Sequence, residues 1–504
     1  MNERKIGILI SYINIVLHAI VGFIYVPLLL HYIGKSEYGL YQLIGSLIAY
    51  FSIMDFGLTA AVVRFYTKYK AESDKVGMEN ILAISLRAYI VITGLLFGIG
   101  CVCYFNLSNV FAESMSVKEI VSAKQLFLLL LLNIVLTVST MIFRAVINAH
   151  EKYLFLKGLE TVQLVLQPLL VLVILKQHPY ALSVALVQTV LNALLIGARI
   201  YYCFRKLNIT IKYHYWDKEL FSEFRKLALS VFAVTLIDQV FFKTNQVILG
   251  IVSGTTAVAV YSVSALIYMN YMALSTAISG VYLPHITSMI ANREPVKKLS
   301  DLFIQIGRWQ YYLLALVAGG FVIFGQRFLE IWAGYGFEDA YWITLLIIIP
   351  FTVDLIQNIG LSIMQAQNKY DFRAKVYFCM GIFNFLLAIP LANEYGGIGC
   401  AFATGLSMFI GNGLIMNWYY AKVTGLDIKE FWLQIGKISI GVLIITIIGY
   451  VMNGLVSDAN VLLYVTKILI YTLVYGLVLY KWFMNEVERN KIDKILRIKR
   501  GVIQ

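Results

Sequence analysis

The sequence is built from repeated apolar runs, each about as long as a helix that crosses a membrane. A spanning helix needs about 20 mostly apolar residues, and runs of that kind occur fourteen times, separated by short polar joints. With 60% hydrophobic and 14% charged residues, the chain is far more apolar than a soluble domain. We therefore predict an all-α integral membrane protein. The predicted spans are approximately 6–30, 39–63, 80–104, 121–147, 156–176, 180–204, 227–253, 257–290, 303–326, 341–366, 376–393, 398–421, 438–456 and 462–484.

Lysine and arginine are distributed unequally between the polar joints, and this predicts the orientation. If the amino terminus is cytoplasmic, 34 of the 41 basic residues lie at inner joints and helix ends, five lie outside and two lie within the membrane. Basic loops stay in the cytoplasm, so both termini are expected inside. The net charge of +13 is then mainly a topology signal, with attraction to anionic membrane lipids as a second effect. Because the basic residues are spread over eight inner segments, no nucleic acid is expected as a partner.

The residue types that build metal, disulfide or catalytic sites are scattered. The five cysteines form no Cys-x-x-Cys pair, and no two of the six histidines have metal-ligand spacing. No phosphate-binding P-loop occurs, and no loop gathers a nucleophile, a base and an acid. We expect no metal, no cofactor and no enzymatic activity.

The chain repeats itself at an offset of 217 to 220 residues. INAHEKYLF at 147–155 matches MQAQNKYDF at 364–372, and GKSEYGLY at 34–41 matches GTTAVAVY at 254–261. Each copy holds six helices, so both copies enter the membrane from the same side and are parallel repeats. The sequence thus predicts two parallel six-helix lobes around a central chamber, with two helices appended. The predicted parts are an N-terminal lobe 1–205, a cytoplasmic linker 206–226, a C-terminal lobe 227–421, appended helices 438–484 and a basic cytoplasmic tail 485–504.

Two stretches resemble one known family. The segment YIGKSEYGLYQLIGSLIAYFSIMDFGLTAAVVRF at 32–65 has a Gly-x-x-x-Tyr-Gly joint and an Asp-x-Gly-Leu-x-x-Ala-x-x-Arg ending that runs from Asp55 to Arg64. The segment FLEIWAGYGFEDAYW at 328–342 looks like the outer joint before the tenth helix. Both resemble bacterial polysaccharide export proteins, the repeat-unit flippases for the O-antigen of lipopolysaccharide, capsule and related glycans. Only Asp55 and Arg64 carry over from the family as chamber residues.

The resemblance implies a fold, a location and partners. The fold would be the two-lobed one shared by multidrug exporters of the toxin-extrusion type and lipid II flippases, placed in the bacterial plasma membrane. The cargo would be a polyprenyl-pyrophosphate-linked oligosaccharide. Because no P-loop occurs, two sources of coupling stay open, an ion gradient of H+ or Na+ and the cargo's own gradient. Glycan polymerase machinery would be a further partner of such a flippase.

The predicted seventh helix carries an unusual polar side, in LIDQVFFKTNQVIL at 236–249. At about 100° per residue, its polar side chains fall on one side of the helix. An unpaired charge at mid-membrane costs several kcal/mol, so such charges usually face a wet cavity or a polar partner. Two interpretations stay open: the side chains line the chamber, or Asp238 and Lys243 are held by partners on adjacent helices. The polar side comprises Thr235, Asp238, Gln239, Lys243, Asn245 and Gln246.

A narrower polar stripe runs along the first helix, where Ser11, Asn14, His18, Gly22 and Tyr25 share one face. Histidine is the side chain whose charge changes most readily near neutral pH, so His18 is expected to be either a proton sensor or a hydrogen-bonded packing residue. The candidate cargo-binding residues are Lys243, Arg64, Asp238, Gln239, Gln246, Asn245, Asp55, Asn14, His18 and Tyr25. Four arginines near inner helix ends are expected to extend to the lipid headgroups: Arg87, Arg144, Arg199 and Arg308.

Three functions compete. A flippase for lipid-linked oligosaccharide repeat units needs a cation for the pyrophosphate and polar or aromatic side chains for the sugars. An ion-coupled multidrug antiporter would favour negative charge in the chamber, which Lys243 and Arg64 oppose. A membrane-embedded glycan-processing enzyme would need a catalytic set on a substantial loop. The flippase is the expected function.

Overall fold

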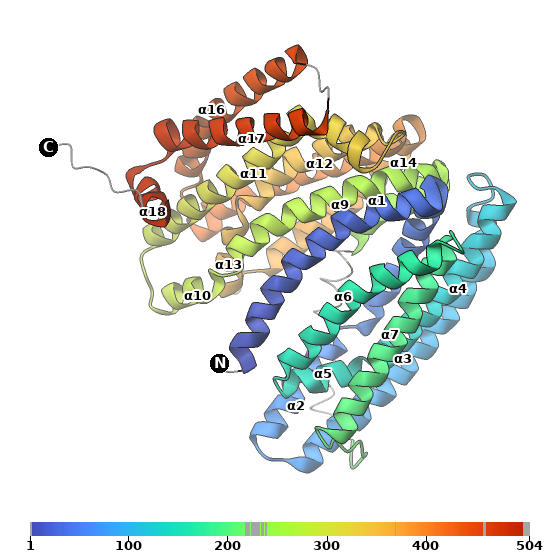
Figure 1. The fold of residues 1–504 in the computed structure, drawn as a ribbon. Coiled ribbons are helices and arrows are strands. Elements are labelled where there is room, and N and C mark those ends of the chain that lie inside the picture. The colour runs from blue at the N-terminus through green and yellow to red at the C-terminus, as the bar shows by residue number, and fades with distance from the viewer. Residues whose placement is uncertain are drawn as a thin grey trace. The chain divides into compact units, whose positions relative to one another are not determined.

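The computed structural model describes residues 3–216, 222, 232, 236, 239–367, 369–456 and 460–496. Within those residues, all the regular elements are helices (Figure 1). Ten continuous helical stretches of the described residues, or up to eleven if one bent pair forms a single span, are long and apolar enough to cross a membrane. The predicted all-α integral membrane fold is confirmed.

The helices follow one another in two groups. The first group is α1 (Glu3–Phe51), the short turn η1 (Ser52–Asp55), α2 (Leu58–Ala71), α3 (Lys75–Val110), α4 (Val117–Ser139), α5 (Met141–Ala149), α6 (Tyr153–Leu175) and α7 (Ala181–Arg205). After a helical stretch at 239–252, the second group is α9 (Gly254–Ser279), α10 (Leu283–Ala291), α11 (Val296–Trp332), α12 (Asp339–Leu355), α13 (Asn358–Ala366), α14 (Asp371–Met408), η2 (Phe409–Met416), α15 (Asn417–Tyr419), η3 (Tyr420–Thr424), α16 (Ile428–Leu455), α17 (Val461–Val478), η4 (Leu479–Phe483) and α18 (Glu486–Leu496).

Two continuous helical stretches are much longer than one membrane crossing. Val16–Ala71 covers 56 residues and Asp371–Thr424 covers 54, whereas about 20 helical residues span 30 Å. The first contains two glycines outside the helical conformation, Gly34 (φ 75°) and Gly57 (φ 70°), and the second contains one, Gly396 (φ 54°). Glycine adopts positive φ without a steric penalty, so each stretch has the length and the turn for two crossings. The predicted number of fourteen spans stays a prediction, because most of 217–238 lies outside the described residues.

The backbone repeats at the offset that the sequence predicts. Positive φ occurs at Gly34 and Gly254, at Ser73 and Arg293, and at Asn208 and Gly425. The first two pairs are 220 residues apart and the third is 217 apart. Non-glycine residues rarely adopt this conformation, so its recurrence at one offset marks equivalent joints in the two copies.

Side-chain packing repeats as well. The rings of Phe155 and Tyr202 stack with centroids 4.0 Å apart and an interplanar angle of 15°. Phe372 and Tyr419, each 217 residues later, stack at 4.0 Å and 10°. Phe155 and Phe372 are the last residues of the two matched sequence segments, so the internal repeat is confirmed in three dimensions.

The chain divides into two compact units, Met1–Leu266 with Gly381–Cys400, and Ile267–Met380 with Ala401–Gln504. In the first unit α1 packs along α6, and α4 packs against α3 and α7 (Figure 1). In the second unit α11 packs against α12, α16 and α17. The predicted boundaries of the five parts of the chain stay predictions.

Two charged residues of the second unit, Arg308 and Lys467, have interaction partners that the sequence did not predict. Arg308 does not extend to headgroups: its side chain is 8% exposed and pairs with Glu488 of α18. The expectation of a headgroup contact was therefore wrong for Arg308. The local sequence did not reveal the ion pair, because Glu488 lies 180 residues away in sequence. Lys467 donates to Asn453 Oδ1 at 3.1 Å and to the carbonyl of Val456, near the end of α16.

Candidate functional site

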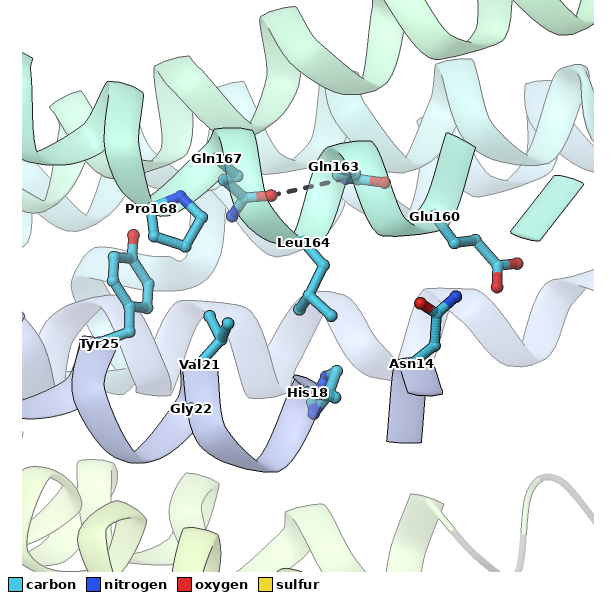
Figure 2. Close-up of a pocket in the computed structure, with 10 residues that line it drawn as sticks. All are labelled: Asn14, His18, Val21, Gly22, Tyr25, Glu160, Gln163, Leu164, Gln167 and Pro168. Atoms are coloured by element: carbon cyan, nitrogen blue, oxygen red, sulfur yellow. Dashed lines mark hydrogen bonds between the residues drawn. The ribbon is translucent and has the colours of Figure 1, made fainter. Parts of the chain in front are cut away.

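A cavity of about 460 Å³, termed cavity 1, lies between α1 and α6 of the first unit. Asn14, His18 and Tyr25 line it from α1, at spacings of four and seven residues, which place side chains on one helix face. These are the three candidate residues of the predicted stripe on the first helix, and the structure brings them to one cavity. Figure 2 shows the opposite wall, formed by α6, with Glu160 facing Asn14 at one end and Pro168 beside Tyr25 at the other.

Among the described residues that line cavity 1, Asn14 is held in place by hydrogen bonds, whereas Tyr25 has a buried hydroxyl without a hydrogen-bond partner. Asn14 is held because its Nδ2 donates to the carbonyl of Lys157 at 3.3 Å and its Oδ1 accepts from Thr161 at 2.7 Å. The buried hydroxyl of Tyr25 has no hydrogen-bond partner in the part of the chain that the structure describes. A buried hydroxyl without a partner is costly, and a ligand oxygen in the cavity would supply one.

Charged side chains meet at the Glu160 end of cavity 1. Glu160 Oε1 lies 2.8 Å from Arg144 Nη2, and Oε2 lies 2.7 Å from Lys157 Nζ. Arg144, expected to extend to the headgroups, therefore also pairs with a carboxylate that lines the cavity.

A second cavity of about 410 Å³, termed cavity 2, lies between α1, α4, α6 and α7. Its lining is rich in amides and holds Lys243, and no carboxylate lines it among the described residues. Gln163 lines both cavities, so they adjoin at that residue. The polar lining residues of cavity 2 include Tyr41, Gln42, Asn133, Gln163, Gln188, Asn192 and Lys243.

Hydrogen bonds fix the polar wall of cavity 2. The Tyr41 hydroxyl donates to Gln188 Oε1 at 2.7 Å. Asn192 Nδ2 donates to Thr137 Oγ1 at 2.7 Å and also to Asn133 Oδ1. Amides offer both donors and acceptors, so this wall suits a ligand with many hydroxyl groups.

The predicted polar side of the seventh helix divides into different environments. Lys243 borders cavity 2, whereas Asn245 and Gln246 are buried and line neither cavity. Asn245 Nδ2 donates to the Tyr261 hydroxyl at 2.8 Å, and Gln246 Nε2 donates to Ser262 Oγ at 2.9 Å.

Of the other two candidate residues on this helix, Gln239 is described and Asp238 is not. Gln239 has a buried Oε1 with no hydrogen-bond partner among the described residues. Asp238 lies outside the described residues, as does Thr235 of the same predicted stripe.

The two residues taken from the family motif lie elsewhere. Asp55 Oδ1 accepts from Thr59 and from the Tyr89 hydroxyl, both at 2.9 Å, beside a helix break at which Phe56 and Gly57 adopt positive φ. Arg64 is exposed, with its guanidinium 5.8 Å from the Phe65 ring centroid. Neither lines cavity 1 or cavity 2.

Sequence reasoning missed the polar face of α6. Glu160, Gln163 and Gln167 all line cavity 1 and are separated by three and four residues. That spacing on an otherwise apolar helix is the signal that identified the stripe on α1. The same signal is present in the sequence of α6 and could have identified this face.

Comparisons with known proteins agree with this architecture. Residues 5–290 match the family model described as polysaccharide biosynthesis protein. The chain is 22% identical over 495 residues to the uncharacterized membrane protein EpsK of Bacillus subtilis (strain 168), covering 95% of each chain. Its fold is similar to the lipid II flippase MurJ in an inward closed conformation, with a TM-score of 0.74 and 18% identity over 97% of this chain and 100% of that one. It is also similar to an inward-facing multidrug resistance MATE family transporter of the MOP superfamily, with a TM-score of 0.63 and 12% identity over 84% and 98%.

Proposed function

Because the chain belongs to the polysaccharide biosynthesis protein family, we propose that it moves a polyprenyl-pyrophosphate-linked oligosaccharide across the bacterial plasma membrane by alternating access. The observation that carries this proposal is the lining of cavity 2, where one lysine stands among amides and tyrosine and no described carboxylate is present. The fold, which is similar to that of a lipid II flippase and of a multidrug resistance transporter, supports transport as the activity.

The chemistry of cavity 2 fits the two parts of such a cargo. The ammonium group of Lys243 would attract the diphosphate, because a charge-assisted hydrogen bond is about twice as strong as a neutral one. The amides and Tyr41 would bind sugar hydroxyls, and Gln188 and Asn192 are already oriented by their own hydrogen bonds. We propose H+ or Na+ as the coupling ion and glycan polymerase machinery as the downstream partner.

An ion-coupled multidrug antiporter is the second candidate, since the fold also occurs in a multidrug resistance transporter. A cationic drug would be repelled by Lys243 and would find no described carboxylate in cavity 2. Glu160 in cavity 1 is already neutralised by Arg144 and Lys157. The electrostatics of both cavities therefore favour an anionic cargo.

The direct test is the leaflet location of the lipid-linked sugar in a strain without the gene. We expect the repeat units to accumulate on the cytoplasmic leaflet and the surface glycan to disappear. Accessibility to an impermeant sugar-oxidising reagent or lectin reports the outer leaflet. Unchanged outward exposure, in a strain with no second flippase, would contradict the proposal, whereas lost efflux of a cationic dye would favour the antiporter.

A further inference from the structure

We propose that Arg144, Lys157 and Arg199 form a diphosphate-binding site at the Glu160 end of cavity 1, and that Glu160 holds two of these cations until a phosphate replaces it. This inference rests on the proposed function, because it says where the pyrophosphate of the cargo binds first. The site is separate from Lys243, which lines cavity 2.

The geometry of the cluster is that of an anion site. Arg144 lies on α5, Lys157 on α6 and Arg199 on α7, so three helices of one unit bring their cations together. Glu160 bridges two of them, with contacts of 2.8 Å to Arg144 and 2.7 Å to Lys157. The side chains of Arg144, Lys157 and Glu160 are 46%, 32% and 27% exposed, so a ligand can reach these groups.

Among the described residues, the charges in the cluster do not balance. Arg199 interacts electrostatically with both Arg144 and Glu160, so three described cations lie near one described carboxylate. Arg199 Nε is buried and has no hydrogen-bond partner among the described residues. A buried charged donor without an acceptor is costly, and the doubly or more negative diphosphate supplies acceptors and matches the surplus of positive charge.

The position of the cluster fits the shape of the cargo. Glu160 lines cavity 1, and Gln163, one helical turn further along α6, lines both cavities. Three residues of α-helix rise about 4.5 Å. A diphosphate held by the cluster would therefore direct its attached sugar towards the amides of cavity 2. The cluster lies at the predicted cytoplasmic end of α5, α6 and α7, where the cargo is made.

Glu160 gives the site a way to release its ligand. When the diphosphate binds, the carboxylate gives up Arg144 and Lys157; when the diphosphate moves towards Lys243, the carboxylate pairs with them again. A cluster of three cations without this carboxylate would bind the diphosphate more tightly and release it more slowly. Glu160 is thus a positioning residue whose removal separates binding from turnover.

The experiment measures calorimetric binding of inorganic pyrophosphate to the purified full-length protein. Glu160→Gln should bind roughly tenfold or more tightly, and Arg144→Gln with Arg199→Gln should bind roughly tenfold or more weakly, since each changes a charge-assisted contact. Arg87→Gln is the matched control, because Arg87 lies over the Tyr213 ring at 4.0 Å and lines neither cavity. It should bind as the wild type does. Size-exclusion elution checks that each variant is folded.

Two further measurements identify the source of the diphosphate and the role of Glu160. Polyprenyl diphosphate in mixed micelles should compete with pyrophosphate, and phosphatidylglycerol at equal concentration should not; equal competition would make this an anionic-lipid site and overturn the proposal. In liposomes, Glu160→Gln should flip lipid-linked sugar several-fold more slowly despite tighter binding.

The two proposals can fail separately. If the protein flips the lipid-linked sugar but the cluster variants bind pyrophosphate and flip as the wild type does, the diphosphate site is wrong and the flippase stands. If Glu160→Gln tightens pyrophosphate binding but no variant, nor the wild type, flips the sugar, the site stands and the flippase proposal is wrong.

Discussion

Arg308 of α11 and Glu488 of α18 form a bidentate ion pair, with Nε and Nη2 each 2.7 Å from a carboxylate oxygen. Both side chains are almost fully buried, at 8% and 0% exposed. Tyr312 and Gln434 add further hydrogen bonds to the pair. A buried ion pair therefore holds α18 against α11, although the sequence predicted only a basic cytoplasmic tail in this region.

Breaking this pair should destabilise the second unit strongly. Glu488→Gln leaves Arg308 buried without its counter-ion, which typically costs about 3–5 kcal/mol. We expect a clearly lower unfolding temperature in detergent and reduced abundance. The matched control is Glu294→Gln, which removes a pair at 3.0 Å between half-buried Glu294 and exposed Lys298 and should cost less than about 1 kcal/mol. Equal effects of the two substitutions would show that the buried pair contributes no more than a surface one.

Lys243→Gln tests the cargo-binding role of cavity 2. The substitution keeps much of the bulk and the hydrogen bonding but removes the charge, so flipping should fall by roughly tenfold or more. The protein should accumulate normally, because no described carboxylate pairs with Lys243. Lys124→Gln is the control, since Lys124 lies over the Tyr104 ring at 5.5 Å and lines neither cavity. An abundant Lys243→Gln protein that flips at the wild-type rate would remove Lys243 from the cargo site.

His150, in the joint between the spans that end at Ala149 and begin at Tyr153, should make stability depend on pH. Partial burial, with Lys70 and Lys152 nearby, lowers its pKa from 6.5 to about 4. Its ring nitrogens lie 3.1 Å from the Tyr66 hydroxyl and 3.1 Å from Lys70 Nζ, which suits a neutral ring. The His150 ring binds a proton more readily in the unfolded chain than in the folded one. The free energy of unfolding should therefore fall as the pH drops from 6.5 towards 4.

The measurement is thermal unfolding at pH 7.5 and pH 5 for the wild type and His150→Gln. The variant removes the titrating group, so its unfolding temperature should fall less between the two pH values. The same decrease in both proteins would assign the pH dependence to other groups.

The orientation of the chain can be tested with single cysteines in a background that lacks the native five. From the 34-to-5 distribution of basic residues, Lys118→Cys and Glu338→Cys should react with an impermeant thiol reagent in intact cells. Glu72→Cys and Asn490→Cys should react only after permeabilisation. Lys118, Glu72 and Asn490 are exposed, so a negative result at these sites reports the membrane side rather than burial. A reversed pattern at two or more sites would overturn the predicted orientation.

The sequence by itself determined the all-helical membrane fold, the repeat and the polar face of α1. Hydropathy and the 3.6-residue period are local properties, so they located the stripe of Asn14, His18 and Tyr25 that lines cavity 1. The 217-residue match that ends at Phe155 and Phe372 predicted equivalent positions, and both rings stack on a tyrosine 47 residues later.

Only the tertiary structure decided which polar groups meet. A helical period assigns a side chain to a face but does not say what covers that face. Lys243 therefore borders cavity 2, whereas Gln246 on the same predicted side is buried against Ser262. Glu160 and Arg144 come from different helices, and Arg308 and Glu488 are 180 residues apart. Such pairs depend on how the helices pack. A buried charge is strongly destabilising unless an opposite charge lies beside it, and only folding brings the two residues together.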